Sequence, residues 1–412
     1  MTPDHATGSE TIDTSKPTAR LWRPRSKSLV GEKGRTARIE LVTTVDRLIE
    51  LEQAWQVLWQ KKQARIFQSH PWLAAWARHK DPHYALRVGL IWEQDGTLAA
   101  ILPMAIRKFL GVGILEWAGQ SVCDYCDGVG SPADLRSLWN SMRKMPGADV
   151  VRLKNIAPDA NVAVLFDAEL TPSDVCLKVA SNSISGDVWF RSLNKKKRNN
   201  FNRGQRLLEE IGSTSMICHE TVPDETLVTR LLELKKSWLK ASNRESSFLF
   251  DDDHPDRLRS LVQALEQLGR LRLFVITCGD AIVSASVNFV EGRSLCAIFS
   301  AYNAEFDRVS PGIMLMTAYT RWAFNNGFTE IDYLQGGEVY KFEFANSETT
   351  LSSVVLPSSV LGHIALAAYR GQRWIGKFRG KTGRLLRTGG AYMTKAGNLR
   401  KIAAPDQREN SS

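Results

Sequence analysis

The sequence lacks a long hydrophobic run. No stretch of about 20 consecutive apolar residues occurs in its 412 residues, which argues against a transmembrane helix. Met1 to Arg20 have no apolar centre, so we expect no secretory signal peptide there. Both absences favour a cytoplasmic protein.

Cysteine is scarce, and its pattern indicates no metal site. Most of the six cysteines sit inside apolar runs, as reduced buried thiols do. The single CxxC pair, Cys123 and Cys126, has no second pair and no suitably spaced histidine. We therefore predict neither zinc nor any other bound metal.

Acidic residues are missing from one long segment. No Asp or Glu occurs from Thr349 to Pro405, while ten Lys and Arg residues lie between Arg370 and Lys401. This basic excess equals the formal net charge of +10, so the rest of the chain is close to balanced. The segment favours an anionic partner such as membrane lipid or nucleic acid, and a solvated basic tail is the alternative.

What is present indicates a globular protein. The apolar content of 43% and the 12 tryptophans support real hydrophobic cores, and the length suits two or three domains. Residues 1–36 are rich in Thr, Ser, Pro, Lys and Arg, so we predict disorder there and a fold that starts at Ala37.

The order of helical and extended patterns is repeated in outline. Residues 37–180 show helices, a hairpin with the turn Glu93 to Gly96, a further strand, a helix and a strand. Residues 181–357 show the same order, with the hairpin turn at Gly279 and Asp280. We predict an α/β (α+β) fold of two tandem units, each a mixed, mostly antiparallel sheet flanked by helices. Residues 358–412 would form a basic helix, Leu361 to Phe378, and a tail.

The stretch from Phe299 to Ala345 is the most specific part of the second unit. A strand ends at Tyr302, a loop closes on Ser310-Pro311-Gly312, and a helix-period run continues to Asn326. Ser310 suits an N-cap, Pro311 suits the first helical position, and Gly312 lets a ligand approach the backbone. Such a helix start can hold a pyrophosphate, although an ordinary strand-helix crossover would look the same.

The chain resembles GNAT acyltransferases of the CelD or BioF2-like type, which are related to the Fem aminoacyltransferases. The resemblance covers about residues 38–380 and rests on Phe67-Gln68-Ser69, Trp72, Trp76, Asp124-Tyr125, Asp127, the helix from Lys195 to Leu207, Ser310-Pro311-Gly312, Trp322-Ala323, Gly327, Asp332 and Gly337-Glu338-Val339-Tyr340-Lys341. It implies a second unit that binds acetyl-CoA or another acyl-CoA, at Arg308, Ser310, Pro311, Gly312 and Ile313. The usual signature, R/Q-x-x-G-x-G/A, is altered here, because Pro311 has no N–H and Gly312 is its one glycine.

Direct acyl transfer needs a base, an acid for the leaving thiol and donors for the oxyanion. Glu338 is the candidate base, Tyr340 the candidate acid, and Lys341 the candidate for the oxyanion or a substrate phosphate. Alternatively, Glu338 and Lys341 simply pair at a surface turn.

Residues of the first unit would face the second across a cleft. Asp124, Tyr125 and Asp127 are candidate acceptor-binding residues, and the alternative is that the Asp residues cap a turn. Arg198 lies in a dense basic helix that suits an anionic substrate such as a nucleotide sugar, or else a solvated helix face.

The resemblance favours an acyl-CoA-dependent N- or O-acyltransferase, an acetyltransferase by preference. Its acceptor would be a sugar or lipid-linked intermediate of polysaccharide or cell-envelope synthesis. The alternatives are a Fem-like transferase that uses aminoacyl-tRNA, and a catalytically silent GNAT-like module of a polysaccharide-synthesis complex. We expect no other nucleic acid partner, and a cytoplasmic protein that contacts the inner face of the membrane through its basic C-terminus.

Overall fold

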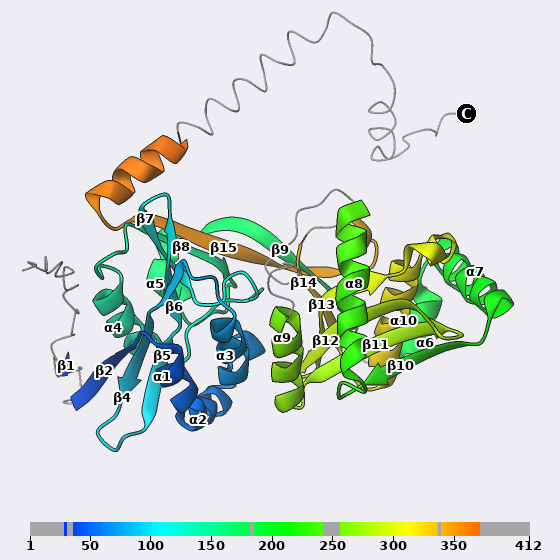
Figure 1. Cartoon of the computed structure of the whole chain (residues 1–412), viewed down its shortest axis with the longest axis horizontal. Helices are drawn as coiled ribbons and strands as arrows, with labels where there is room; N and C mark the ends of the chain where they lie inside the picture. The colour runs from blue at the N-terminus through cyan, green and yellow to red at the C-terminus, as the bar shows by residue number, and fades with distance from the viewer. Residues whose placement is uncertain (1–28, 31–35, 182–184, 242–255, 337–338, 371–412) are drawn as a thin grey trace, which may run out of the picture.

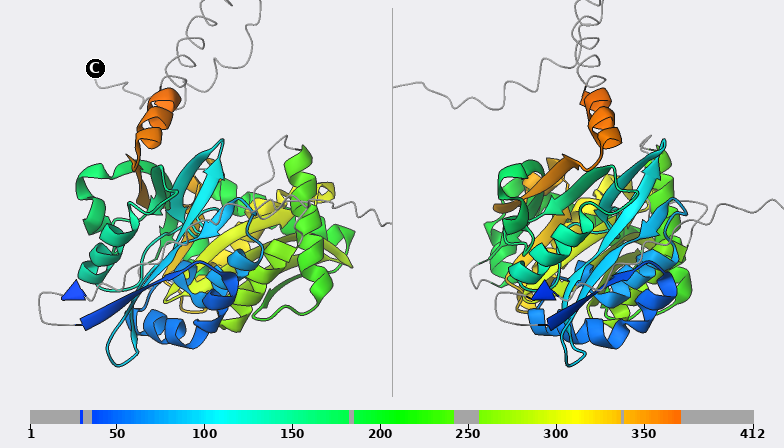
Figure 2. Two further views of the ribbon diagram at one scale, coloured as in Figure 1. Left: turned by 60° about the vertical axis from the view of Figure 1, so that its left-hand side comes forward. Right: turned by 90° about the vertical axis from the view of Figure 1, so that its left-hand side faces the viewer.

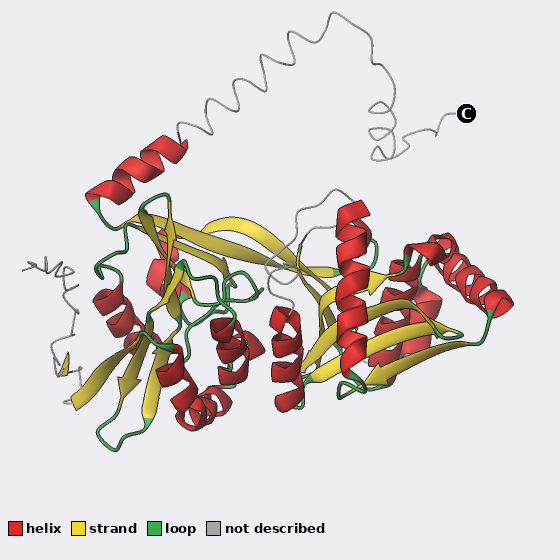
Figure 3. Ribbon diagram, viewed as in Figure 1, coloured by secondary structure: helices red, strands yellow, loops and turns green. Residues whose placement is uncertain are grey.

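The structure, a computed structural model, describes residues 29–30, 36–181, 185–241, 256–336 and 339–370. Helices flank one mixed sheet of 11 strands and one antiparallel sheet of four strands, so the fold is of the predicted α/β class (Figures 1 and 3). The long sheet has the strand order β10-β11-β12-β13-β14-β9-β15-β8-β7-β6-β3, and the short sheet β1-β2-β4-β5.

The first unit contains β2 (Thr36–Val42), α1 (Val45–Glu50), α2 (Glu52–Lys62), α3 (His70–Arg78), β3 (Tyr84–Leu86), β4 (Val88–Trp92), β5 (Leu98–Leu102), β6 (Met104–Phe109), β7 (Val112–Trp117), α4 (Pro132–Met142), β8 (Val150–Ile156), α5 (Ala163–Phe166) and β9 (Thr171–Ala180). A short strand, β1 (Leu29–Val30), pairs with β2. These two residues lie inside the segment predicted to be disordered, so that prediction is wrong for them. The remainder of residues 1–35 lies outside the described residues.

The second unit contains α6 (Gly186–Ser192), α7 (Lys195–Ile211), β10 (Thr214–His219), α8 (Glu225–Ala241), α9 (Asp256–Gln267), β11 (Leu271–Cys278), β12 (Ala281–Glu291), β13 (Ser294–Tyr302), the 3-10 segment η4 (Ala304–Val309), α10 (Pro311–Asn325), β14 (Glu330–Gln335), α11 (Val339–Phe342) and β15 (Ser347–Pro357). Residues 360–370 then form a helix, and the rest of the predicted basic helix lies outside the described residues. Among the described residues, no helix is long and apolar enough to cross a membrane.

The tandem design is confirmed by the strand pairing. In the first unit, β7 and β8 are parallel neighbours joined through the crossover helix α4. In the second unit, β13 and β14 are parallel neighbours joined through α10. All other pairs in both sheets are antiparallel.

The two units share the long sheet through their last strands, which the sequence did not predict. Strand β9 pairs with β14 of the second unit, and β15 lies between β9 and β8 of the first unit. Figures 1 and 2 show β9 and β15 running from one unit to the other. The exchange leaves neither unit with an open sheet edge at the junction.

Two extended runs of the first unit are each split between the sheets. The hairpin turn is confirmed, because Glu93 N–H donates to the Thr97 carbonyl at 2.9 Å. Each run was predicted to be a single strand, but breaks at Arg87 and Pro103 send β4 and β5 into the short sheet and β3 and β6 into the long one. Pro103 has no N–H, which suits the position where the ladder is interrupted.

The apolar core is divided by the long sheet. One cluster fills the first unit and continues to the face of the second unit that carries α8 and α9, and it contains Trp55, Trp72 and Trp76. The other lies under α6, α7 and α10 and contains Trp189, Tyr319 and Phe324. Strand β14 therefore presents one set of side chains to the first unit and the alternate set to α10.

Candidate active site

Strands β13 and β14 part soon after they begin. Their parallel pairing covers Ser294 with Glu330, Leu295 with Ile331, and Cys296 with Asp332. Strand β13 then continues to Tyr302 without pairing to β14, and α10 starts just beyond the parted end. The wedge between the strands and the start of α10 thus lie together.

The start of α10 has no side-chain cap. Ser310 has a left-handed backbone (φ 53°, ψ 61°), and its side chain makes no capping hydrogen bond. Ser310 therefore occupies the N-cap position as predicted but does not cap the helix with its side chain, because a capping side chain works from an extended backbone. Pro311 occupies the first turn as predicted. The N–H groups of Gly312 and Ile313 are first-turn donors that the helix itself does not use.

The matching helix of the first unit begins with the same Ser-Pro pair but is closed. Ser131 has an extended backbone (φ −76°, ψ 152°), and its hydroxyl accepts from Asp134 N–H at 3.2 Å. The same hydroxyl donates to the Asp134 carboxylate at 2.6 Å. The first turn of α10 contains no acidic residue. Of these two helix starts, only that of α10 is open to an anion, because no side chain caps it and no acidic residue lies in its first turn.

A cavity with room for about 450 Å³ lies between α7 and the start of α10. Its lining includes Ser310, Ile313 and Thr317 from the α10 side, and Lys196, Lys197 and Asn200 from α7. Helix α7 comes close because Gly204 faces η4, where a Cβ atom would lie 3.1 Å from the Val309 carbonyl oxygen. The cavity therefore combines a helix start with two lysines, which suits an anionic ligand.

Local contacts fix the α7 wall of the cavity. The Asn194 side chain caps α7 by accepting from Lys197 N–H at 2.9 Å. The Lys197 ammonium donates to the Glu343 carbonyl and lies 4.8 Å from the centre of the Phe344 ring. These contacts hold one positive charge in place at the cavity wall before any ligand arrives.

The fold leaves room for a side chain at Gly312, so packing does not explain the glycine there. A Cβ atom there would meet Tyr302 at 3.7 Å, which is an ordinary contact. Three of the five predicted donor-site residues are not in the cavity lining: Arg308, which is exposed on η4, Pro311, which is buried, and Gly312. Ser310 and Ile313 line it, with Gly312 between them.

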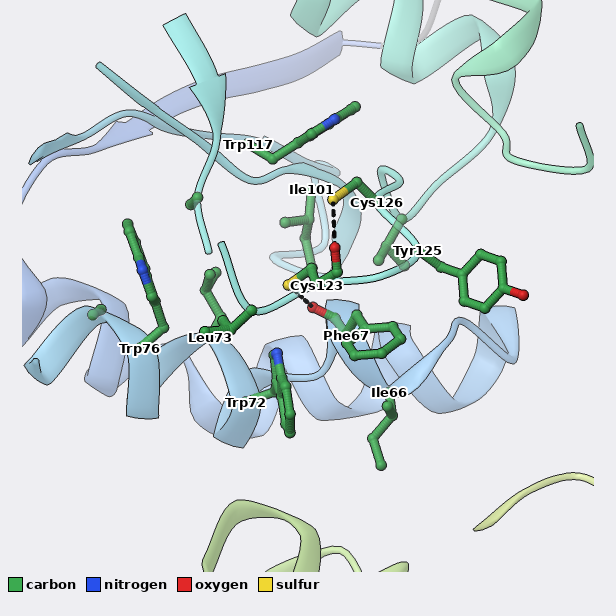
Figure 4. Close-up of a cluster of buried hydrophobic side chains, with 14 of the residues drawn as sticks. Ile66, Phe67, Trp72, Leu73, Trp76, Ile101, Trp117, Cys123, Tyr125 and Cys126 are labelled. Atoms are coloured by element: carbon green, nitrogen blue, oxygen red, sulfur yellow. Dashed lines mark hydrogen bonds between the residues drawn. The ribbon is translucent and has the colours of Figure 1, made fainter. Parts of the chain in front are cut away.

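A second polar group lies where the units meet. Tyr125 sits on the loop between β7 and α4, and in Figure 4 its hydroxyl points away from the apolar cluster around Trp72 and Cys123. This hydroxyl donates to Asp332 Oδ2 at 2.6 Å. Lys178 Nζ lies 3.3 Å from the same oxygen and 3.2 Å from Glu330. Tyr125 thus joins the first unit to β14.

Burial and the Asp332 carboxylate keep the Tyr125 hydroxyl protonated, although two cations lie near its ring. Its ring lies 4.3 Å from the Arg65 guanidinium carbon and 6.0 Å from Lys178 Nζ. Burial and the neighbouring Asp332 carboxylate raise the pKa of Tyr125 far above its usual range. Burial acts to lower the pKa of Lys178, but Asp332 and Glu330 raise it overall. The group is thus a neutral donor and a cation around one buried carboxylate.

Asp332 also shapes the end of its own strand. Its Oδ1 accepts from Leu334 N–H at 2.8 Å, and Leu334 has a left-handed backbone (φ 56°). The bend turns Gln335 toward the first unit, where its side chain contacts Asn155 at 3.1 Å and Asp174 at 2.6 Å. Asp332 had no predicted role, although a lone acid inside the apolar run Ile331 to Leu334 was a usable signal.

The other predicted acceptor residues have structural contacts. Asp127 accepts from the backbone N–H groups of Gly128, Asn161 and Val162, so it holds a turn. Arg198 donates to the carbonyls of Arg191 and Leu193 and secures the end of α6. Asp124 is half-buried. The contacts of Asp127 and Arg198 therefore give no support to acceptor binding by these two residues. Among the four predicted acceptor residues, Tyr125 is the one that lies in the group around Asp332.

The predicted catalytic loop is described in part. Glu338 lies outside the described residues. Lys341 is 8% exposed, and its Nζ donates to the Gln335 carbonyl at 3.1 Å, so it ties α11 to the end of β14. Tyr340 is half-exposed, and it adds to burial in raising the pKa values of Tyr319 and Tyr333. Tyr340 therefore lies near the junction of α10 and β14.

The CxxC cysteines are free thiols, as are the other four. Figure 4 shows the Cys126 thiol directed at the Cys123 carbonyl and the Cys123 thiol directed at the Phe67 carbonyl, at 3.6 and 3.9 Å. Five of the six are buried and Cys218 is half-buried, so the prediction of reduced, mostly buried cysteines is confirmed.

Comparison with known families agrees with this geometry. A family model described as an acetyltransferase (GNAT) domain matches residues 195–342, which run from α7 to α11 and include the start of α10. The second unit therefore carries a GNAT-type acetyltransferase domain. A search of curated proteins finds no significant match to the sequence.

Solved structures of similar architecture are distant in sequence. FemX is 11% identical, with a TM-score of 0.49 over 74% of this chain and 96% of FemX. The C-terminal domain of a putative lysylphosphatidylglycerol synthetase from Agrobacterium fabrum is 14% identical, with a TM-score of 0.48 over 79% and 96%. A tandem GNAT protein from the clavulanic acid biosynthesis pathway is 10% identical, with a TM-score of 0.41 over 78% and 99%. At these TM-scores the likenesses carry no argument about substrate.

Proposed function

We propose that this protein is a GNAT-type acyltransferase whose second unit binds an acyl-CoA at the start of α10. The observation that carries the proposal is the contrast between two helices with the same Ser-Pro start. Ser131 and Asp134 close the start of α4, whereas the Ser310 side chain leaves the start of α10 uncapped. The second unit then binds the acyl donor, and the first unit binds the acceptor.

The residues around the cavity fit the phosphates of such a donor. Ile313, Lys196 and Lys197 line the cavity of about 450 Å³, so the Ile313 N–H and the two ammonium groups would supply donors and positive charge there, with the Gly312 N–H beside them in the first turn. The lysines compensate for the N–H that Pro311 lacks. When bound, acyl-CoA supplies an acyl group activated as a thioester.

The acceptor would approach from the side of the first unit. In the reaction, an acceptor nitrogen or oxygen forms a bond to the acyl carbon, the carbon–sulfur bond breaks, and the thiolate takes a proton. We assign the proton removal to Glu338 and the proton delivery to Tyr340, whose position near α10 and β14 supports the second role. Lys341 would position this loop, because its ammonium is bonded to the end of β14.

The proposed acceptor is a sugar or lipid-linked intermediate of polysaccharide or cell-envelope synthesis, modified on the cytoplasmic side. The buried Asp332 carboxylate between Tyr125 and Lys178 supports this proposal, because such a polar group where the units meet can orient polar groups of an acceptor. Incubation with acetyl-CoA and a panel of amino sugars and nucleotide sugars, with acetylated products detected by mass spectrometry, would identify the acceptor class.

The donor site is tested by exchanging the two helix starts. Ile313→Asp places in α10 the acid that α4 has at its third helical position, and should abolish the rise in melting temperature caused by CoA or acetyl-CoA. Asp134→Asn, the control in α4, should keep the full rise. A CoA-induced rise that survives Ile313→Asp would contradict the proposed site, and no rise in the unaltered protein at millimolar CoA would contradict an acyl-CoA donor.

A further inference from the structure

One end of the first unit brings together two segments that are far apart in the sequence. They are the hairpin tip between β6 and β7 and the helix at residues 360–370. Asp149 joins them, because its Oδ2 accepts from Gly113 N–H at 2.9 Å and its Oδ1 accepts from the Ser359 hydroxyl at 2.6 Å. Its carbonyl also accepts from Ser358 N–H at 2.7 Å. Figures 1 and 2 show both segments projecting from this end of the molecule.

Large apolar side chains on both segments are exposed. At the hairpin tip, Phe109 is 55% and Leu110 is 88% exposed. On the helix, Val360 is 78% and Ile364 is 61% exposed. Four such side chains therefore gather at one end of the molecule. We call these four residues the apolar end.

Leu110 holds its place at a conformational cost. Its backbone is left-handed (φ 47°), a conformation that glycine, asparagine and aspartate adopt more readily than leucine. The side chain contributes nothing to a core, because it is almost fully exposed. A turn residue chosen for folding alone would be polar, so the leucine fits a contact outside the molecule.

The first turn of the helix is fixed to the body of the first unit. Gly362 is buried, and a Cβ atom there would lie 1.8 Å from the Asp149 carbonyl oxygen. The Ser359 hydroxyl accepts from Gly362 N–H at 3.1 Å. The first turn therefore sets the direction of the helix, which projects from this end of the molecule (Figure 2). Ile364, one turn further on, is 61% exposed.

Positive charge surrounds the apolar end. Lys108 in the hairpin and Arg143 and Lys144 in the loop before Asp149 are exposed. The helix leads directly into the segment that has ten Lys and Arg residues and no acid. Exposed apolar side chains next to a cluster of basic residues match the chemistry of an anionic lipid surface.

We propose that the apolar end docks this protein onto an anionic membrane surface. Phe109, Leu110, Val360 and Ile364 enter the interface, and Lys108, Arg143 and Lys144 lie against the lipid phosphates. The helix lies on the bilayer and does not cross it. This inference is independent of the proposed donor site, since none of its residues lines the cavity beside α10.

Sedimentation with lipid vesicles tests the inference. The full chain should sediment with vesicles of phosphatidylcholine and phosphatidylglycerol, bind phosphatidylcholine alone at least about tenfold more weakly, and be released by 0.5 M salt. Leu110→Asp and Ile364→Asp should each weaken binding by about fivefold to tenfold. Leu110→Asp keeps a residue suited to the left-handed backbone, so its melting temperature should not fall.

The matched control is Ile211→Asp, on the last residue of α7, because Ile211 is 67% exposed and so resembles Ile364. It should leave vesicle binding unchanged. Equal losses for Ile211→Asp and Ile364→Asp would overturn the inference. A failure of the full chain to bind anionic vesicles would also overturn it. A dimer that Ile364→Asp dissociates would then indicate a second copy as the partner, and tight binding of RNA would indicate a nucleic acid.

Discussion

Tyr125 is one of the residues that link the two units through a hydrogen bond to a charged group. Its hydroxyl meets Asp332 at 2.6 Å, and its ring lies against Arg65. Asp332 in turn bends β14 at Leu334. This contact, between residues 207 positions apart, helps to connect the first unit to the end of the strand that precedes the predicted catalytic loop.

Tyr125→Phe should lower the free energy of unfolding by about 1.5–3 kcal/mol, because it removes a donor from a buried carboxylate and keeps the ring beside Arg65. The matched control is Tyr302→Phe, since the Tyr302 hydroxyl accepts from the neutral Trp238 indole at 2.9 Å. Its loss should be about 0.5–1.5 kcal/mol. Urea unfolding measures both, and equal losses would show that the charge on Asp332 adds nothing to the bond.

The elements themselves follow mostly from local pattern. The hairpin turn from Glu93 to Gly96 and the Ser-Pro-Gly helix start were predicted from residue types whose backbone preferences are local. The split at Pro103 was not, because the apolar run from Leu98 to Ile106 continues across it. The left-handed backbone of Ser310 and its contrast with Ser131 depend on packing against η4 and α7, which no local pattern contains. The same holds for Asp332, whose partner lies in the other unit.

Glycines on two neighbouring helices should respond in opposite ways to alanine. A Cβ atom at Gly186 of α6 would lie 1.8 Å from the Arg321 carbonyl oxygen, so Gly186→Ala should destabilise by about 1–3 kcal/mol or more. A Cβ atom at Gly312 would meet Tyr302 at 3.7 Å, so Gly312→Ala should be neutral or stabilise by up to about 1 kcal/mol.

Gly312→Ala should nevertheless weaken CoA binding, because the methyl group would occupy the space that a phosphate needs beside the backbone. Thermal unfolding with and without CoA separates the two effects. A Gly312→Ala protein that is destabilised, or that binds CoA as tightly as before, would show that the glycine serves the fold and not the ligand.

The whole molecule is organised by the sheet that both units share. Strand β15 pairs with β8 of the first unit as well as with β9, so neither unit has a complete sheet without the other. Tandem units could be recognised from the repeated order of elements. The exchange of their last strands could not, because pairing between strands so far apart leaves no periodic signal in either one.

The shared sheet predicts that the units unfold together. Urea titration followed by far-ultraviolet circular dichroism and by tryptophan fluorescence should give one coincident transition. Residues 37–180 expressed alone should aggregate or remain unfolded, since β8 and β9 would both expose unpaired edges. Two separate transitions, or a stable and monomeric 37–180 fragment, would contradict this expectation.

The position of β15 also governs how the chain folds during synthesis. Strand β8 leaves the ribosome roughly 190 residues before its partner β15, which at 5–20 residues per second is a wait of about 10 seconds or more. Throughout that interval the nascent first unit presents an unsatisfied strand edge beside a tryptophan-rich core. Mutations that slow translation or folding of the second unit should therefore cause aggregation that begins in the first.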